Sequence, residues 1–97
     1  MSILVLLEVN ANPGNGKDIT NWLRDELHHT RGFDGCNGIT IHTNQKEPNN
    51  LVFVEDWDSL PQYEKYLAFR TERGDIGKLG AWLAGEASIR YFENAGV

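Results

Sequence analysis

Four segments of the chain carry the alternating or continuous apolar pattern of β-strands. The first spans 2–10 and is apolar on both faces over residues 3–7, which favours a central strand covered on both sides. The other three predicted strands span 38–44, 51–57 and 87–93. The polar segment 45–50, with Pro48, Asn49 and Asn50, predicts a hairpin loop. We therefore expect the second and third strands to pair antiparallel.

Apolar residues at helical spacing predict three helices. The first spans 17–30 and has one stripe made of Ile19, Trp22, Leu23 and Leu27. Gly32 follows it, where a left-handed C-cap is expected.

The second predicted helix has a clear start signal. Ser59 can accept a hydrogen bond from the amide of Gln62, and Gln62 can reach back to the amide of Ser59. This helix runs to about residue 73, and a shorter one is expected over 75–83, with inward residues Ile76, Leu79 and Leu83.

The order β-α-β-β-α-(α)-β predicts an α+β fold, a ferredoxin-like split βαβ unit with a four-stranded antiparallel sheet. Ninety-seven residues suit a single domain over 1–97. Both helical layers would lie on one face of the sheet, and the other face is apolar enough to need a cover. A second copy of the chain is the simplest cover, so we expect a homodimer.

Charge and composition exclude several partners. Nine Lys and Arg against fourteen Asp and Glu give a net charge of −5, with no basic run. Nucleic acid and anionic membrane surfaces are therefore not expected partners. The early apolar run of five residues is too short for a bilayer span, and no basic segment precedes it. Together with a lone cysteine, Cys36, this favours a cytoplasmic location.

Sorting strand residues by parity separates two chemical sets. One is nearly all aliphatic and comprises Ile3, Val5, Leu7, Val9, Ile39, Ile41, Val52, Val54 and Ile89. The other mixes polar and aromatic groups: Leu6, Glu8, Asn10, Thr40, His42, Phe53, Glu55, Trp57, Arg90 and Phe92. If each set occupies one face of the sheet, the first is a packed core and the second resembles the lining of a ligand cavity.

The polar set also has simpler explanations. Glu8, Glu55 and Arg90 suit an ion-pair network at a dimer interface equally well. His42 suits a hydrogen-bonded strand residue, and Trp57 suits a core residue. The stripe of Tyr63, Tyr66 and Phe69 on the second helix suits packing as well as substrate contact.

Motifs of common enzyme classes are missing from the chain. It has no G-x-S-x-G, no P-loop and no complete G-x-G-x-x-G. His28 and His29 are adjacent, not four apart, so they do not form a zinc pair on one helix face. We expect no metal ligands and no cofactor, and Cys36 has no basic neighbour in sequence that would activate it.

Several segments resemble one known family. Glu55-Asp56-Trp57-Asp58-Ser59 resembles the E-x-W-x-S signature of the antibiotic biosynthesis monooxygenase family, which are small dimeric α+β barrels. The segments 30–36, 66–75 and 88–92 resemble recurrent segments of that family, so the resemblance covers nearly the whole chain.

The resemblance implies a homodimeric barrel that oxidises phenols, hydroquinones or polyketide-like aromatics with O2 and uses no metal, flavin or haem. On that reading the expected catalytic residues are Trp57, Tyr63, Tyr66 and His42. Substrate-binding residues would be Asn10, Phe53, Glu55, Phe69, Arg70 and Arg90. Trp57 and Phe53 would stack the ring, a tyrosine and an arginine would stabilise the phenolate, and His42 or Glu55 would take the proton.

The sequence also departs from the family pattern. Many members carry a histidine nine residues after the signature tryptophan, where this chain has Tyr66. Haem-degrading relatives place a tryptophan at that position and an iron-ligating histidine on the following helix. This chain has no histidine after His42, which disfavours haem degradation. A non-catalytic ligand-binding or stress-response protein with the same barrel is the alternative, and a structural subunit of a larger assembly is a third.

Overall fold

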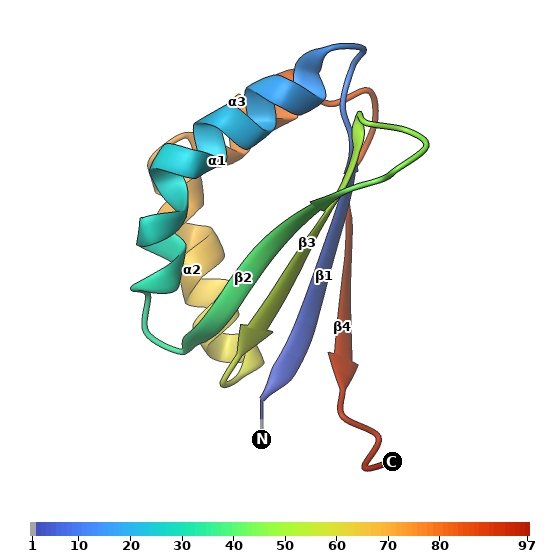
Figure 1. The fold of residues 1–97 in the computed structure, drawn as a ribbon. Helices are drawn as coiled ribbons and strands as arrows, with labels where there is room; N and C mark the ends of the chain where they lie inside the picture. Colours follow the sequence, from blue (N-terminus) through green and yellow to red (C-terminus); the bar gives the residue numbers. More distant parts are fainter. Residues whose placement is uncertain (1) are drawn as a thin grey trace.

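The computed structural model describes residues 2–97 and shows four strands and three helices (Figure 1). In chain order the elements are β1 (Ile3–Asn10), α1 (Asn15–Arg31), β2 (Cys36–Thr43), β3 (Asn50–Trp57), α2 (Leu60–Glu72), α3 (Asp75–Ala81) and β4 (Ser88–Glu93). This confirms the predicted order, with every boundary within two residues of its prediction.

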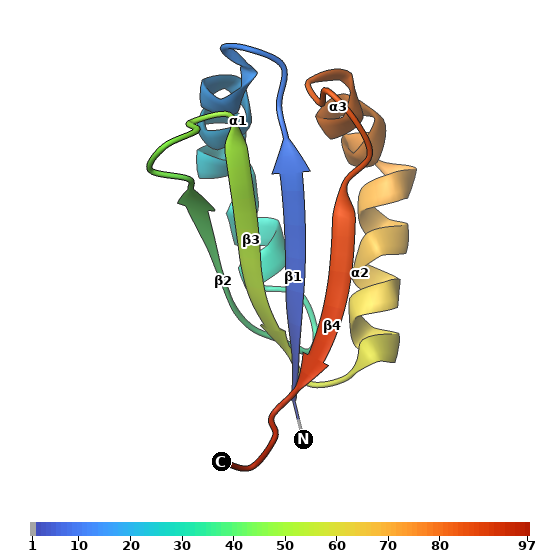
Figure 2. The same cartoon turned by 90° about the vertical axis from the view of Figure 1, so that its right-hand side faces the viewer.

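The strands form one antiparallel sheet in the order β2-β3-β1-β4. All three helices lie on one face of this sheet, and the other face carries no element of the described chain (Figures 1 and 2). In Figure 2 the uncovered face points toward the viewer, with the helices behind it. The α+β, ferredoxin-like architecture is confirmed.

The parity sort of the strands is correct for β1, β2 and β4 and wrong for β3. Pairing places Glu55 opposite Val5 and Ile39, and Phe53 opposite Leu7 and Ile41. Paired residues of neighbouring strands share a face, so Phe53, Glu55 and Trp57 point toward the helices. Val52 and Val54 lie on the open face instead. The pairing of β2 with β3 shifts register once, between Cys36 and Gly38. The alternation of residues along the sequence does not reveal such a shift.

The core between sheet and helices divides into two clusters. An aliphatic cluster joins α1 and α3 to the sheet, with Val9, Ile19, Leu23, Leu27 and Leu51 among its buried members. The second cluster is aromatic and contains Val5, Trp57, Tyr63 and Tyr66. The predicted stripe on α1 is thus confirmed, and the tyrosines of α2 are core-facing.

Three local predictions need correction. Gly32 ends α1 in a right-handed conformation (φ −90°), because its amide continues the helical pattern by bonding to the carbonyl of His28. Ile76 is only partly inward, because it lines the space between helices and sheet but is 44% exposed, whereas Leu79 of the same short helix is buried. The Ser59 hydroxyl accepts a hydrogen bond from the backbone N–H of Gln62, as expected. The same hydroxyl donates to Oε1 of Gln62, so this oxygen does not accept from the backbone N–H of Ser59.

Gly35 marks the turn between α1 and β2 and requires its glycine. Its φ is +94°, and a Cβ there would lie 2.7 Å from the Gln62 side chain. Any other residue would meet both backbone strain and a clash with α2. No helix within residues 2–97 has the length and apolarity needed to cross a membrane.

Candidate functional site

A small cavity lies between the helix-facing side of the sheet and the three helices. Its volume is about 50 Å³. The sheet contributes Phe53 and Glu55, α2 contributes Tyr63, Tyr66 and Arg70, and the remaining wall is mostly aliphatic. An apolar cavity with a few converging polar groups is the usual form of a small-molecule site.

Glu55 is the ionisable group that the sheet presents to this cavity. Its side chain comes from β3 and is only 3% exposed. Burial raises the pKa of the Glu55 carboxyl to about 7, while the Trp57 hydrogen bond and the Arg70 charge act in the opposite direction. Near neutral pH this group therefore populates both protonation states, as an acid–base catalyst requires.

Trp57 holds one side of that carboxyl. Its indole Nε1 donates a hydrogen bond to Oε1 of Glu55 at 3.1 Å, and its ring is fully buried. The two residues are separated by one position on the same strand, so both point toward the helices. The second carboxyl oxygen has no hydrogen-bond partner among the described residues and is not sealed from the cavity.

Tyr63 supplies a second free polar group. The residue is 1% exposed, and its ring packs against Trp57 at 5.5 Å between centroids. Within residues 2–97 its hydroxyl has no hydrogen-bond partner. Burial raises the pKa of the Tyr63 phenol, so this group stays protonated and can donate a hydrogen bond to a ligand.

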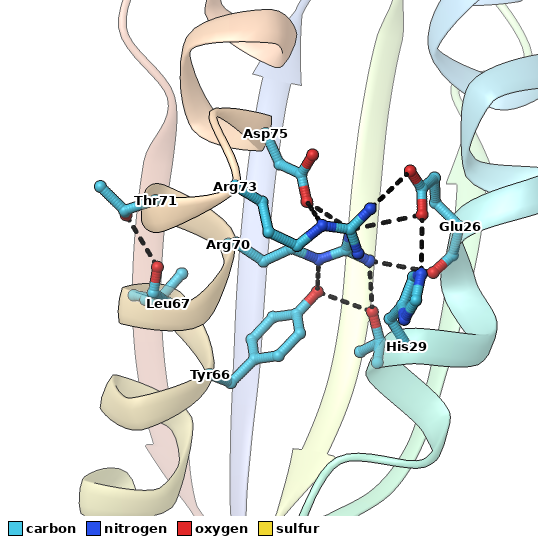
Figure 3. Close-up of polar contacts among 9 residues, drawn as sticks. Glu26, His29, Tyr66, Leu67, Arg70, Thr71, Arg73 and Asp75 are labelled. Atoms are coloured by element: carbon cyan, nitrogen blue, oxygen red, sulfur yellow. Dashed lines mark hydrogen bonds and ion pairs between the residues drawn. The ribbon is translucent and has the colours of Figure 1, made fainter.

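Tyr66 and Arg70 belong to a buried polar network (Figure 3). The Tyr66 hydroxyl lies 2.6 Å from the Thr30 hydroxyl and accepts from Arg70 Nε at 2.8 Å. Arg70 also donates to Asp75 at 2.7 Å, to the Glu26 carbonyl at 3.0 Å and to the Thr30 hydroxyl at 3.1 Å. The network ties α1, α2 and α3 together at one end of the cavity.

The other predicted site residues lie elsewhere. Phe69 packs on Phe33 and His29 outside the cavity wall, and Trp57 bonds to Glu55 without lining the cavity itself. His42 and Arg90 are exposed on the open face, where His42 bonds to Thr40 and Arg90 to Glu8. Asn10 is exposed on the same face and accepts from Asn50.

The predicted site thus divides between the two faces of the sheet. The helix-facing group comprises Phe53, Glu55, Tyr63, Tyr66 and Arg70 around the cavity. The open-face group comprises Asn10, His42 and Arg90. Because a sheet separates the two groups, they do not form one site within a single chain.

Sequence reasoning missed Asp75 and most of the aliphatic wall. Asp75 is buried at the start of α3 and pairs with Arg70. A carboxylate directly after Gly74 in the first turn of a helix reads as a helix-dipole contact, so nothing local marks it as a buried partner. The wall residues Leu23 and Leu27 belong to the predicted apolar stripe of α1, which does not reveal whether the stripe meets side chains or a cavity.

Metal and thiol chemistry find no support in these side chains. Within residues 2–97, no three His, Cys, Asp or Glu side chains are grouped so that they could hold a metal ion. Burial raises the pKa of the Cys36 thiol, so little reactive thiolate is present at neutral pH.

Comparison with known protein families identifies the chain's relatives. The family described as "Antibiotic biosynthesis monooxygenase" matches residues 2–70. This chain belongs to the antibiotic biosynthesis monooxygenase family. The match contains β1 to β3 and α2 as far as Arg70, and therefore every cavity-facing polar residue described above except Asp75.

Solved structures share the family fold at low sequence identity. A conserved protein from Methanosarcina mazei Go1 superposes with a TM-score of 0.86 and 16% identity, over 96% of this chain and 92% of that one. A putative antibiotic biosynthesis monooxygenase from Deinococcus radiodurans gives a TM-score of 0.83 and 19% identity, over 98% and 94%. SnoaB, a cofactor-independent oxygenase from Streptomyces nogalater, gives 0.83 and 11%, over 99% and 95%. No curated protein sequence matches the chain.

These similarities establish the fold of the chain. Family membership supports a general monooxygenase-like role.

Proposed function

We propose that this protein is a cofactor-independent monooxygenase that oxidises a small phenolic or hydroquinone substrate with O2 in the cavity beneath β3. The observation that carries the proposal is the Glu55 carboxyl. It is buried, has a pKa of about 7, is held by Trp57 on one side and has an oxygen left free toward an apolar cavity. A carboxyl with these properties can act as a general base at neutral pH.

The proposed reaction needs no further redox group in the protein. Glu55 takes the proton from the substrate hydroxyl, and the resulting phenolate gives one electron to O2. The superoxide formed then bonds to a hydrogen-bearing ring carbon next to the one that holds the phenolate oxygen, and Glu55 returns its proton to the resulting peroxide. The hydroperoxide loses that carbon's hydrogen as its O–O bond breaks, so one oxygen atom ends as a quinone carbonyl and the other as water.

Tyr63 would assist by stabilising the developing anion. Its hydroxyl is protonated and free within the described structure, so it can donate to the phenolate oxygen. The aromatic and aliphatic walls exclude water, which strengthens this hydrogen bond. The Tyr66 hydroxyl is already hydrogen-bonded to Thr30 and Arg70, so the role of Tyr66 would be to shape the cavity wall.

Oxygen uptake by the purified protein, with hydroquinone or 4-methylphenol and no added cofactor, tests the proposal. The Glu55→Gln variant keeps the side-chain shape but removes the base, and we expect uptake to fall at least about a hundredfold, as is typical for loss of a general base. Glu72→Gln is the matched control, since Glu72 is an exposed carboxylate at the end of α2. Equal rates in the wild type and Glu55→Gln would contradict the assignment.

A ligand-binding protein without catalysis is the second candidate. It is favoured by the engagement of Tyr66 and Arg70 in the helix network, which leaves only Glu55 and Tyr63 free to act on a substrate. Saturable binding of a phenol with no oxygen uptake would establish this alternative.

We also propose that the functional unit is a homodimer. The open face of the sheet exposes the cross-strand partners Leu4 and Phe92 by 37% and 41%, and the pair Leu6 and Val54 on the same face is half-buried. A contiguous apolar sheet face of this kind favours an isologous partner. The cytoplasmic location expected from the sequence stays a prediction.

A further inference from the structure

The cavity wall combines a cation, Arg70, that is paired within the protein with two groups, Glu55 and Tyr63, that each keep a free polar atom. We infer that its ligand, and under the proposed function its substrate, is an uncharged phenol with a single aromatic ring. Three features carry this inference: the pairing of Arg70, the free groups of Glu55 and Tyr63, and the size of the cavity.

Arg70 has at most one N–H donor left, which is fewer than the two that a carboxylate ligand takes from a guanidinium in a bidentate pair. A guanidinium offers five N–H donors, and four of them are taken by Tyr66, Asp75, Glu26 and Thr30. Its charge is balanced by Asp75 at 2.7 Å, and the Glu26 carboxylate lies 3.8 Å away. A ligand carboxylate would have to displace one of these contacts, so the cavity offers it no unpaired positive charge.

The charges around Glu55 also disfavour an anion. Arg70 of α2 is the charged group that acts on the Glu55 carboxyl, and the neighbours whose pKa Glu55 raises are Tyr63 and Tyr66 of α2, Cys36 of β2 and Tyr91 of β4. Only Arg70 is cationic, and Asp75 of α3 neutralises it. An ionised ligand would therefore sit beside an ionisable carboxyl in a dry site, which is costly.

A neutral hydroxyl fits the two free groups. Glu55 offers a carboxyl oxygen that can accept a hydrogen bond, and Tyr63 offers a hydroxyl that can donate one. A phenol hydroxyl donates one bond and accepts another, so a single substrate group satisfies both. Phenols have a pKa near about 10 and enter the cavity uncharged.

Cavity size limits the rest of the ligand. The volume of about 50 Å³ is smaller than the roughly 150 Å³ apolar cavity that holds benzene in another protein. Even one ring therefore needs a wall residue to yield. Ile76 is suited to this, because it lines the cavity and is 44% exposed, so it can turn outward without leaving a buried position. A fused second ring would require the buried wall or the α3 backbone to move as well.

Binding of three ligands at pH 7 tests the inference by calorimetry, separately from any turnover. We expect 4-methylphenol to bind at least tenfold more tightly than 4-hydroxybenzoate, which differs in charge, and than 2-naphthol, which differs in ring number. Comparable affinity for either competitor, or no binding of 4-methylphenol, would overturn the inference. Tight binding of 4-methylphenol with no oxygen uptake would refute the proposed oxygenase and leave the ligand class standing.

Ile76→Ala sharpens the size argument. Shortening this side chain enlarges the mouth of the cavity, and we expect at least a fivefold gain in affinity for 2-naphthol with 4-hydroxybenzoate still excluded. Leu60→Ala is the matched control, since Leu60 is 38% exposed and lies at the start of α2 outside the wall. An equal gain in both variants would refute the role of Ile76.

Discussion

At the scale of single residues, the family signature acquires a physical meaning. Glu55 and Trp57 are two apart on β3, and the strand geometry aims both at the helices. The indole N–H then fixes one carboxyl oxygen and leaves the other for a ligand. We interpret Trp57 as a positioning residue for Glu55, in place of the ring-stacking role expected from the sequence.

Replacing Trp57 by Phe should change how Glu55 titrates. The indole hydrogen bond favours the carboxylate, so its loss should raise the pKa of Glu55 above about 7. A hydrogen bond to a charged group contributes at least about 1.5 kcal/mol, which corresponds to about one pH unit. The rise of oxygen uptake with pH should move upward by that amount. Trp82→Phe, remote from Glu55, should leave the profile in place, and an unmoved profile in Trp57→Phe would contradict the role.

Glu55 should also make stability fall as pH rises. Its pKa is about 7 when folded and about 4.5 when unfolded, so the folded state holds its proton more tightly. The stabilising effect of that proton is complete below pH 4.5 and lost as pH rises through 7. Urea unfolding of the wild type and Glu55→Gln should diverge by about 3 kcal/mol over this window, in favour of the Gln variant at high pH. Parallel pH curves would show that the Glu55 pKa is not raised.

At the scale of elements, α3 depends on Arg70 for its position. The helix has only seven residues, begins after Gly74 at φ +82°, and buries Asp75 against the guanidinium. A helix this short is not stable by itself. The ion pair between Arg70 and Asp75 therefore holds α3 in place, and with it the part of the cavity wall that α3 contributes.

Removing Asp75 should destabilise the fold more than removing an exposed charge. Asp75→Ala leaves the buried Arg70 with one close partner fewer, and we expect a loss of about 3 kcal/mol in the free energy of unfolding. Arg73→Gln is the comparison, because Arg73 contacts the same carboxylate from a side chain that is 33% exposed. That change should cost no more than about 1 kcal/mol. Equal losses of unfolding free energy in the two variants would show that burial does not increase the contribution of the Arg70–Asp75 pair to stability.

At the scale of the whole molecule, the sheet has one covered and one uncovered face. Three helices cover the cavity side (Figure 2), whereas the other side presents an apolar strip along β1, β3 and β4 made of Leu4, Leu6, Val54 and Phe92. The polar residues first assigned to the site, His42 and Arg90, border that strip. We therefore propose that His42 and Arg90 lie at the interface between two copies of the chain.

Sedimentation equilibrium should report about 22 kDa, twice the 11.0 kDa of the chain. Val54→Lys places a charge at the centre of the open face and should yield monomers of about 11 kDa with the fold intact by circular dichroism. Leu60→Lys, on the helical side, should stay dimeric. A wild-type mass of 11 kDa at micromolar concentration would contradict the dimer.

Local patterns along the chain are enough to predict the elements, their order and the fold class. Period-two and period-3.6 patterns, the Ser59 cap and the turn residues act within a few positions of one another, so local reading reaches them. It also singled out Glu55, Tyr63, Tyr66 and Arg70 as the polar residues of interest.

Only the tertiary structure decided which of these residues meet. The phase of β3 relative to β1 depends on strand pairing, and a one-position error exchanges Glu55 with Val54. The partnership of Arg70 with Asp75, Thr30 and Glu26 joins three helices that are distant along the chain. Long-range contacts of this kind leave no local pattern, and they are what assigns Arg70 to the scaffold and Glu55 to the proposed chemistry.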